Sequence, residues 1–230
     1  MTPLFDLGKI PTRHSYSSLS VYKSCPARYG YTYLAGMKEP STAAMDRGTR
    51  LHSLAEQYML APKDSPVPYD LKKIGIILYQ LREKGALPEQ TWCVNASWES
   101  VDEKDPSAKI KAIVDVHYLD GGVIKIRDYK SGREYPTHAD QFELYAIMGL
   151  CRYPLAQRAE SGGVYIDAGN EGRERSIIRE MLPALTRRWT TLIVQLEGDR
   201  AFQPTPGLHC QRCSQRGSAG GPCGYEYRGE

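Results

Sequence analysis

The chain has 230 residues, of which 41% are hydrophobic and 25% are charged, with a formal net charge of +3 at pH 7. This is ordinary globular composition, which excludes disordered and collagen-like chains, and the charge permits a polyanionic partner without implying one. No window approaches the roughly 18 apolar residues of a membrane span. The segment Met1 to Arg13 lacks a signal-peptide pattern. We therefore expect a cytoplasmic protein without membrane contact, whose six cysteines form no disulfides.

The predicted elements change along the chain from helices to a mixture of strands and helices. Apolar residues at helical spacing predict helices over 15–34 (broken at Pro26), 48–60, 70–81, 137–151 and 182–196. Segments rich in β-branched and aromatic residues predict strands over 91–101, 108–119, 123–130, 163–167 and 175–178. We therefore expect an α/β or α+β domain over residues 1–202. Residues 203–230 are aperiodic and rich in Pro, Gly and Cys, and need another source of order.

Two aspartates face each other across a predicted hairpin. A two-residue turn at Gly121-Gly122 puts Asp115 opposite Asp128, whereas a turn at Asp120-Gly121 makes them diagonal neighbours. Alternation along the strands places both on the face that carries the apolar residues. Opposed carboxylates that are partly buried destabilise a sheet unless a cation lies between them or one stays protonated. Two carboxylates suit a hard cation such as Mg²⁺ or Mn²⁺.

Lys130 lies two residues beyond Asp128 on the same predicted face. An ammonium group at this position can orient a metal-bound water or neutralise a developing oxyanion. The three residues together supply what phosphodiester hydrolysis requires. A surface hairpin with an acidic pair is the alternative.

The residues around this hairpin resemble the PD-(D/E)XK nuclease superfamily in its RecB-like form. Asp115 followed by Asp128-Tyr129-Lys130-Ser131-Gly132 is similar to its signature. Gly48 to His52, followed by Glu56, resembles that branch's G-T-x-x-H helix, and Gln141 to Tyr145 resembles its Q-x-x-x-Y helix. The segment from Ser17 to Tyr29 resembles its N-terminal box. The matches follow the family's order from Ser15 to Tyr145.

This resemblance implies a fold, an activity and roles for particular residues. The fold is a restriction-endonuclease-like core, a mixed sheet flanked by helices, and the activity is that of a Mg²⁺- or Mn²⁺-dependent deoxyribonuclease, an exonuclease in our reading. The implied ligands of the metal are His52, Asp115, Asp128 and the carbonyl of Tyr129. The implied catalytic lysine is Lys130, with His52, Asp115 and Asp128 completing the catalytic set.

Further residues are candidates for support or DNA contact. Glu56 lies four residues after His52, on the same helix face, where it can orient the imidazole. Gln141 and Tyr145 share that spacing and suit a phosphate or base. Glu99 is a candidate for one more carboxylate at the site, and Arg212 and Arg216 are candidates for phosphate contacts. An ordinary packed or solvated side chain is the alternative for each.

Three cysteines in the last segment, Cys210, Cys213 and Cys223, predict a metal site that orders a region with little core. Cys25 is the candidate fourth ligand, with His209 as the alternative. Thiolates at this spacing suit either zinc or a [4Fe-4S] cluster. The resemblance favours [4Fe-4S], because CRISPR-associated and AddB-type nucleases of this branch have one cysteine near the N-terminus and three near the C-terminus. Cys93 and Cys151 are expected to be buried.

The motifs favour a nuclease that acts on DNA in replication, recombination, repair or phage- and CRISPR-related processing. One alternative is a DNA-binding or scaffolding module, and another is a nuclease active only with a recombination, helicase or CRISPR-adaptation partner. The motif G-x-x-x-x-G-K-[ST] of nucleotide-driven helicases is absent from the sequence. Cleavage polarity, strand preference and assembly into a homo-oligomer are left open.

Overall fold

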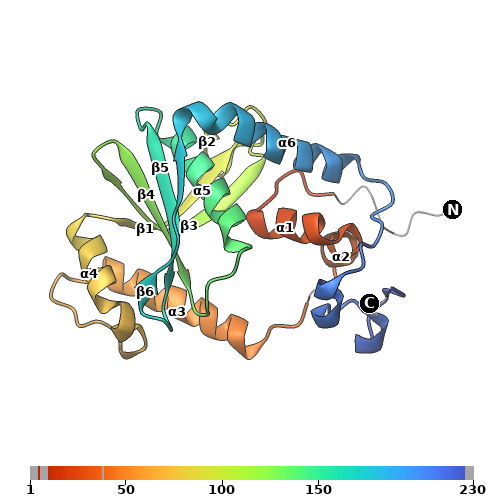
Figure 1. Cartoon of the computed structure of the whole chain (residues 1–230), viewed down its shortest axis with the longest axis horizontal. Coiled ribbons are helices and arrows are strands. Elements are labelled where there is room, and N and C mark those ends of the chain that lie inside the picture. Colours follow the sequence, from red (N-terminus) through yellow and green to blue (C-terminus); the bar gives the residue numbers. More distant parts are fainter. Residues whose placement is uncertain (1–4, 6–9, 38, 226–230) are drawn as a thin grey trace. The chain divides into compact units, whose positions relative to one another are not determined.

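The computed structural model describes residue 5 and residues 10–37 and 39–225. The chain divides into two compact units, one of residues 42–186 and one that combines the chain up to residue 41 with the chain from residue 187. Figure 1 shows the first as a twisted sheet with helices on it, and the second as mainly helical and irregular. None of the helices in the described part of the chain is both long and apolar enough to cross a membrane.

The unit of residues 42–186 contains the sheet. Its helical elements are α3 (Ala43–Leu60), η3 (Tyr69–Ile74), α4 (Gly75–Glu83), α5 (His138–Arg152), η4 (Arg179–Met181) and the start of α6 (Leu182–Gly198). Its strands are β1 (Leu87–Val94), β2 (Ser100–Val101), β3 (Ile110–Asp120), β4 (Val123–Lys130), β5 (Arg158–Tyr165), β6 (Asn170–Glu171) and β7 (Arg175–Ile178). This unit therefore contains the mixture of strands and helices that the sequence predicts.

These strands form one mixed sheet in the order β2-β1-β3-β4-β5-β6, with β7 also paired to β5. Strands β4 and β5 are parallel and are joined by α5, whereas the other neighbouring pairs are antiparallel. A parallel pair needs such a crossover connection, because the chain must return to the same end of the sheet. The predicted mixed α/β fold is confirmed.

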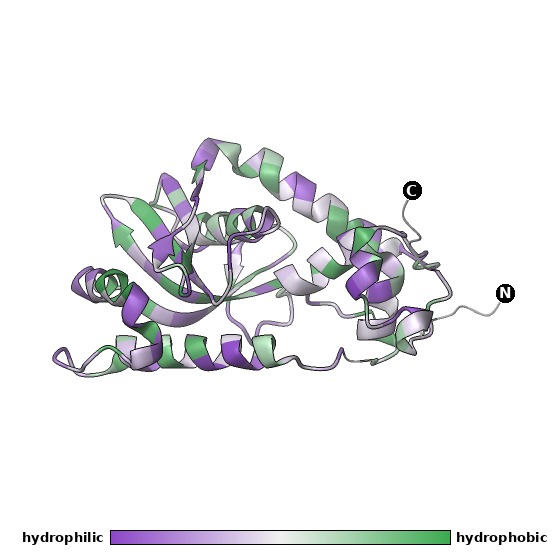
Figure 2. Cartoon of the chain, turned by 60° about the horizontal axis from the view of Figure 1, so that its bottom comes forward, coloured by the Kyte–Doolittle hydropathy of each residue, from purple (hydrophilic) through white to green (hydrophobic). Residues whose placement is uncertain are grey.

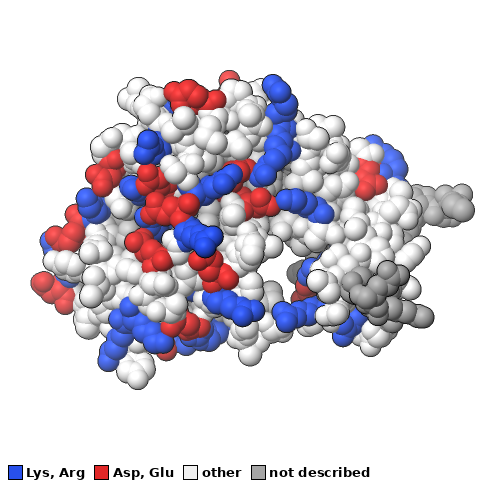
Figure 3. Space-filling view, viewed as in Figure 1, with Lys and Arg blue, Asp and Glu red and all other residues white. Residues whose placement is uncertain are grey.

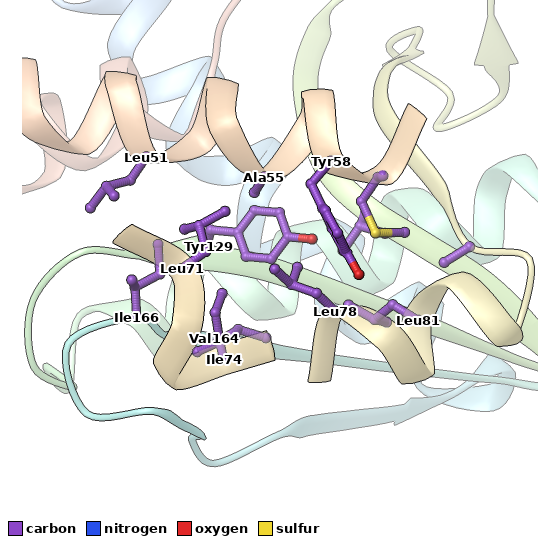
Figure 4. Packing of buried hydrophobic residues seen from close by; sticks show 13 residues of the cluster. Leu51, Ala55, Tyr58, Leu71, Ile74, Leu78, Leu81, Tyr129, Val164 and Ile166 are labelled. Carbon is purple, nitrogen blue, oxygen red and sulfur yellow. The ribbon is translucent and has the colours of Figure 1, made fainter. Parts of the chain in front are cut away.

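Helices cover both faces of the sheet. On one face α5 approaches closely at Gly149, where a Cβ atom would lie 3.0 Å from the Ile126 side chain and 3.4 Å from that of Trp92. On the other face α3, η3 and α4 bury an apolar cluster around Tyr129 of β4 (Figure 4). Along α3 hydrophobic and hydrophilic residues alternate in bands, as burial of one side requires (Figure 2). Strand β4 is therefore buried from both sides.

The second unit consists of short helices and turns. They are α1 (Tyr16–Ser24), α2 (Pro26–Tyr29), the π-helical turn η2 (Gly30–Leu34), the end of α6, η5 (Leu208–Arg212) and η6 (Gly217–Ala219). Ser15 caps α1 as expected, because its side chain accepts a hydrogen bond from the Ser18 backbone. Tyr29 stacks on Phe202 with 5.9 Å between ring centroids. Aromatic contacts thus join the early and late segments within this unit.

Three predicted boundaries are wrong in instructive ways. The segment 91–101 is two strands, because Asn95 forms a side-chain-stabilised turn between β1 and β2. Strand β5 begins at Arg158, not 163, since sheet pairing includes polar residues such as Glu160 that carry no apolar pattern. The helix expected from residue 70 begins as the 3-10 turn η3, and becomes α-helical at Gly75.

Candidate functional site

The hairpin of β3 and β4 has the register expected from a Gly121-Gly122 turn. Asp120 pairs with Val123, and the pairing continues to Val116 and Arg127. The next position in this register joins Asp115 to Asp128, but the regular pairing stops before it. The two aspartates therefore lie where β3 and β4 begin to separate.

Glu89 occupies the corresponding position on the other side of β3. Pro88 pairs with Val116 and Gln90 with Val114, so this register sets Glu89 opposite Asp115. The pairing is again interrupted at this position, and Glu89 has a φ of +39°. A non-glycine residue in this region carries about 1–3 kcal/mol of strain. Three carboxylates thus occupy one row across β1, β3 and β4.

The side-chain alternation along β3 changes at this row. Beyond it, Val116 lies in the cluster under α3 and α4, while its neighbour His117 is on the α5 face, where its Nε2 lies 2.6 Å from the Tyr153 hydroxyl. Before it, Trp92, the partner of Ala112, contacts Gly149 of α5. Simple alternation would put Val116 and Ala112 on one face. The predicted regular alternation along this strand is therefore wrong at Asp115, and Ile113, two residues before it, is 47% exposed.

The change of face accompanies contact between Asp115 and helix α3. One carboxylate oxygen of Asp115 lies 3.1 Å from Nδ1 of His52, and the other accepts a hydrogen bond of 2.7 Å from the Tyr129 backbone. Burial disfavours the charged imidazole, but the hydrogen bond and charge of Asp115 outweigh it and raise the pKa of His52. Helix α3 and strands β3 and β4 therefore meet at this carboxylate.

Asp128, Lys130, Gln141 and Tyr145 form a second, continuous set of contacts. Lys130 Nζ lies 2.6 Å from Asp128 Oδ2 and donates a hydrogen bond of 2.8 Å to Gln141 Oε1. Gln141 Nε2 lies within 3.0 Å of both Asp128 Oδ1 and the Tyr145 hydroxyl. The motif of α5 thus contacts the motif of β4 directly. We call His52, Glu89, Asp115, Asp128, Lys130 and Gln141 the candidate centre.

The Asp128 carboxylate is buried, with 3% of the residue exposed. Burial raises the pKa of Asp128 to about 6, and the charge of Asp115 adds to this, while Lys130 opposes it. Oδ2 lies 2.6 Å from the Lys130 ammonium, and within the described part of the chain no group donates to it a hydrogen bond of regular geometry. A buried carboxylate oxygen with free lone pairs suits a cation.

Glu89 is the residue that the sequence analysis missed. Glu89 is exposed, but partial desolvation, the charges of Glu56 and Asp115, and a hydrogen bond with Glu56 raise its pKa. Glu56 itself was expected to orient His52, but its identified partner is Glu89. The predicted strand began at Thr91, so no pattern placed Glu89 in the sheet. A charged residue next to a proline gave no other signal.

The residues present fit a hard divalent cation. Asp115, Asp128 and His52 offer oxygen and imidazole donors, and the Tyr129 N–H points toward β3 and Asp115. The N–H and C=O of one strand residue point the same way, so the Tyr129 carbonyl also points toward β3. Within residues 5, 10–37 and 39–225, no three His, Cys, Asp or Glu side chains already converge to hold a metal. The donors are instead held by the contacts described above.

Three other predicted residues lie elsewhere. Glu99 is in the turn before β2, where it accepts a hydrogen bond of 2.7 Å from the Asn95 side chain. Arg216 donates hydrogen bonds to the backbone carbonyls of Cys210 and Gln211. Arg212 is exposed at the end of η5. The contacts of Glu99 are thus those of a local turn, and those of Arg216 are internal to its own unit.

The second unit brings four cysteines to one small pocket, lined by Cys25, Cys210, Cys213 and Cys223 and also by His209. We call it the four-cysteine pocket. All four thiols are free, and two accept backbone N–H contacts, Cys25 from Thr205 at 3.5 Å and Cys210 from Gly207 at 3.4 Å. Burial raises the pKa of Cys213. The thiols face a common space but do not meet the spacing of a metal site as they stand.

Comparison with known protein families agrees with this geometry. The family model described as "PD-(D/E)XK nuclease superfamily" matches residues 13–107 and 80–218. The chain belongs to this superfamily. The residues that resemble the signature of this superfamily in sequence, Asp115, Asp128 and Lys130, all lie in the candidate centre.

The comparison with solved structures found similar chains at low sequence identity. A protein from Eubacterium rectale that carries a provisional exonuclease name has a TM-score of 0.51 and 13% identity, over 90% of this chain and 87% of that one. LHK-Exo in complex with dAMP has a TM-score of 0.42 and 17% identity, over 83% of this chain and 89% of that one. The comparison with curated proteins found no match.

Proposed function

We propose that the protein is a Mg²⁺- or Mn²⁺-dependent deoxyribonuclease of the RecB-like branch, acting as an exonuclease. Two sets of contacts in a chain of this superfamily carry the proposal: Asp115 with His52 and the Tyr129 backbone, and Asp128 with Lys130 and Gln141. The exonuclease names of similar structures are consistent with it. Membership alone does not specify a substrate, so the proposal rests on the chemistry of this centre.

Each residue has a role that follows from its contacts. The cation would be held by Asp115, Asp128, His52 and the Tyr129 carbonyl, and when bound it supplies a more acidic water and polarises a phosphoryl oxygen. Lys130 donates to the phosphate as negative charge develops. Gln141 holds Lys130 and Asp128 in place through its two side-chain contacts. Glu89, with its raised pKa, is placed to accept a proton beside Asp115.

For the four-cysteine pocket we propose a [4Fe-4S] cluster, with zinc as the alternative. The grouping of the four thiols supports this proposal, as do the backbone N–H groups that point at two of them, since such donors stabilise thiolate ligands. Iron, sulfide and zinc analysis of protein purified without oxygen distinguishes the two. Equal amounts of iron and sulfide would support the cluster, whereas stoichiometric zinc would support the zinc alternative. Absence of both iron and zinc would contradict both proposals.

Hydrolysis of end-labelled linear DNA, single- or double-stranded, tests the activity. Native protein with Mg²⁺ or Mn²⁺ is compared with Lys130→Met and with Lys125→Met, which changes a lysine on the same strand that pairs with Glu160. We expect loss of cleavage by at least about 100-fold in Lys130→Met only. Closed circular DNA that resists cleavage identifies an exonuclease. Equal activity of both variants would contradict the assigned centre.

A further inference from the structure

A pocket beside the candidate centre contains residues without a role so far. It lies in the unit of residues 42–186 and is lined by the chain after β4, the first turns of α5 and the chain before β7. Its volume is about 540 Å³, within the range of small-molecule sites, about 300–1,000 Å³. Its lining includes Tyr135, His138, Phe142, Arg173 and Arg175.

Two connections place this pocket next to Lys130. His138 lies three residues before Gln141 on α5, and Gln141 contacts Lys130 and Asp128. The His138 ring stacks on Tyr165 with 5.8 Å between centroids, and Tyr165 is the β5 partner of Lys130. The charge of Lys130 helps, after burial, to lower the pKa of His138. The pocket therefore lies within about one helical turn of the reacting groups.

The lining combines aromatic surface with hydrogen-bond donors. Tyr135 is 44% exposed, whereas Phe142 is buried. His138 Nδ1 is 2.8 Å from the Tyr165 hydroxyl and 3.4 Å from the Tyr135 backbone nitrogen. Because Nδ1 accepts these contacts, the neutral ring carries its proton on Nε2 and can donate from there. The site thus offers a ring for stacking and a donor for a polar edge.

The cations around this pocket differ in whether they are already paired. Arg175 contacts Glu143 at 3.0 Å, and Glu174 pairs with Arg127. Over the described part of the chain, Arg173 forms no salt bridge, and Arg133 lies over the Tyr135 ring at 5.1 Å. Basic and acidic side chains are interspersed on the surface of this unit (Figure 3). An unpaired guanidinium beside an exposed ring is therefore a local feature, not part of a general basic surface.

We propose that this pocket binds one nucleotide of the DNA strand being cut, next to the scissile phosphate. The base stacks on Tyr135, its edge accepts from His138, and Arg173 contacts the adjoining phosphate. A base needs an apolar face and a polar edge, and its phosphate needs a cation, and the pocket supplies all three. The inference rests on the proposed nuclease function and adds to it a site that recognises the base.

Oligonucleotides that end in a normal or an abasic nucleotide test this site. We compare native protein with Tyr135→Ala and with Tyr69→Ala, a control tyrosine that is 80% exposed on η3. For each enzyme the readout is the ratio of kcat/KM on the two substrates, so partial loss of folded protein cancels. Stacking on one aromatic ring corresponds to about a 5- to 100-fold effect. We expect native protein and Tyr69→Ala to prefer the normal end by at least this factor, and Tyr135→Ala to lose most of the preference.

The outcomes separate this inference from the nuclease proposal. Cleavage with no preference in native protein, or with the same preference in all three proteins, overturns the pocket and leaves the nuclease intact. If native protein cleaves neither DNA nor bis(p-nitrophenyl) phosphate, the nuclease proposal fails. In that case, binding of the same labelled oligonucleotides tests whether the pocket binds a base. A preference in Kd that depends on Tyr135 supports it, and equal Kd values overturn it.

Discussion

Most side chains of the candidate centre contact another of its members, whereas those of the four-cysteine pocket share a space without bonding to each other. In the centre, His52 lies against Asp115, and Lys130 and Gln141 against Asp128. In the pocket, two of the thiols accept backbone N–H contacts. The centre lies on α3, β3, β4 and α5, whereas three of the cysteines lie in or beside short turns.

This difference indicates what orders each site. Regular elements with a shared core fix the donor atoms of the centre before any cation binds, which is the preorganisation that catalysis requires. Turn-rich segments bury little apolar surface, so the ligand of their cysteines contributes to folding. We therefore expect the first region to lose activity but keep its fold without metal, and the second to lose order.

Removal of metal is the strongest test of this contrast. We expect EDTA to reduce DNA cleavage by at least about 1,000-fold, because no activated water remains. Circular dichroism should show unchanged secondary structure, since protein contacts hold the centre, and added Mg²⁺ or Mn²⁺ should restore cleavage. Unfolding of the sheet-containing unit on metal removal would contradict the expectation that protein contacts hold the candidate centre.

Loss of one thiol tests whether a bound metal orders the four-cysteine pocket. Cys210→Ser should abolish the bound cluster or zinc and expose the chain after residue 187 to trypsin. The unfolding free energy of its unit should fall by about 3 kcal/mol or more. Cys151→Ser is the matched control, because burial raises the pKa of Cys151 to about 11 and it lies outside the pocket. Metal content equal to native in Cys210→Ser would remove that residue from the site.

Glu89 tests whether the row of carboxylates acts in the reaction. Glu89→Gln should reduce kcat/KM by about 10- to 100-fold and alter the pH profile, because it removes a proton acceptor beside Asp115. Glu83→Gln changes a glutamate whose partner is the exposed Lys63, and should have native activity. A Glu89→Gln enzyme with a native rate and pH profile would leave this residue a structural role only.

His117 is a buried polar residue of the sheet, and its ionisation can be tested through the stability of the protein. Burial, with a contribution from Arg152, lowers the pKa of His117 to about 4, below its ordinary value near 6.5. The unfolded chain therefore binds this proton first, and stability falls as the pH drops from about 6.5 to 4, by about 3 kcal/mol from this group. His117→Gln should show a shallower loss in denaturant titrations across that range. An identical slope would refute the assignment.

Much of the fold follows from local pattern. The amphipathic spacing of α3 and α5 and the β-branched content of β3 and β4 predicted these elements, and the Gly121-Gly122 turn gave their register. Residues with a motif of their own, such as Lys130 and Gln141, were also identified. Strand β5 was shortened because its first residues are polar, and pairing with β4 and β7 determines its start.

The sequence by itself determined which side chains have the chemistry of a nuclease, because their spacing on one strand or one helix face is a local property. Only the tertiary structure placed Glu89 opposite Asp115 and changed the face to which the β3 side chains point at that row. The pairing of β1 with β3 joins residues distant in sequence, and the φ of +39° at Glu89 is not a preference of that residue type. Likewise, the gathering of Cys25 with the late cysteines depends on the folded unit, since nothing local brings them together.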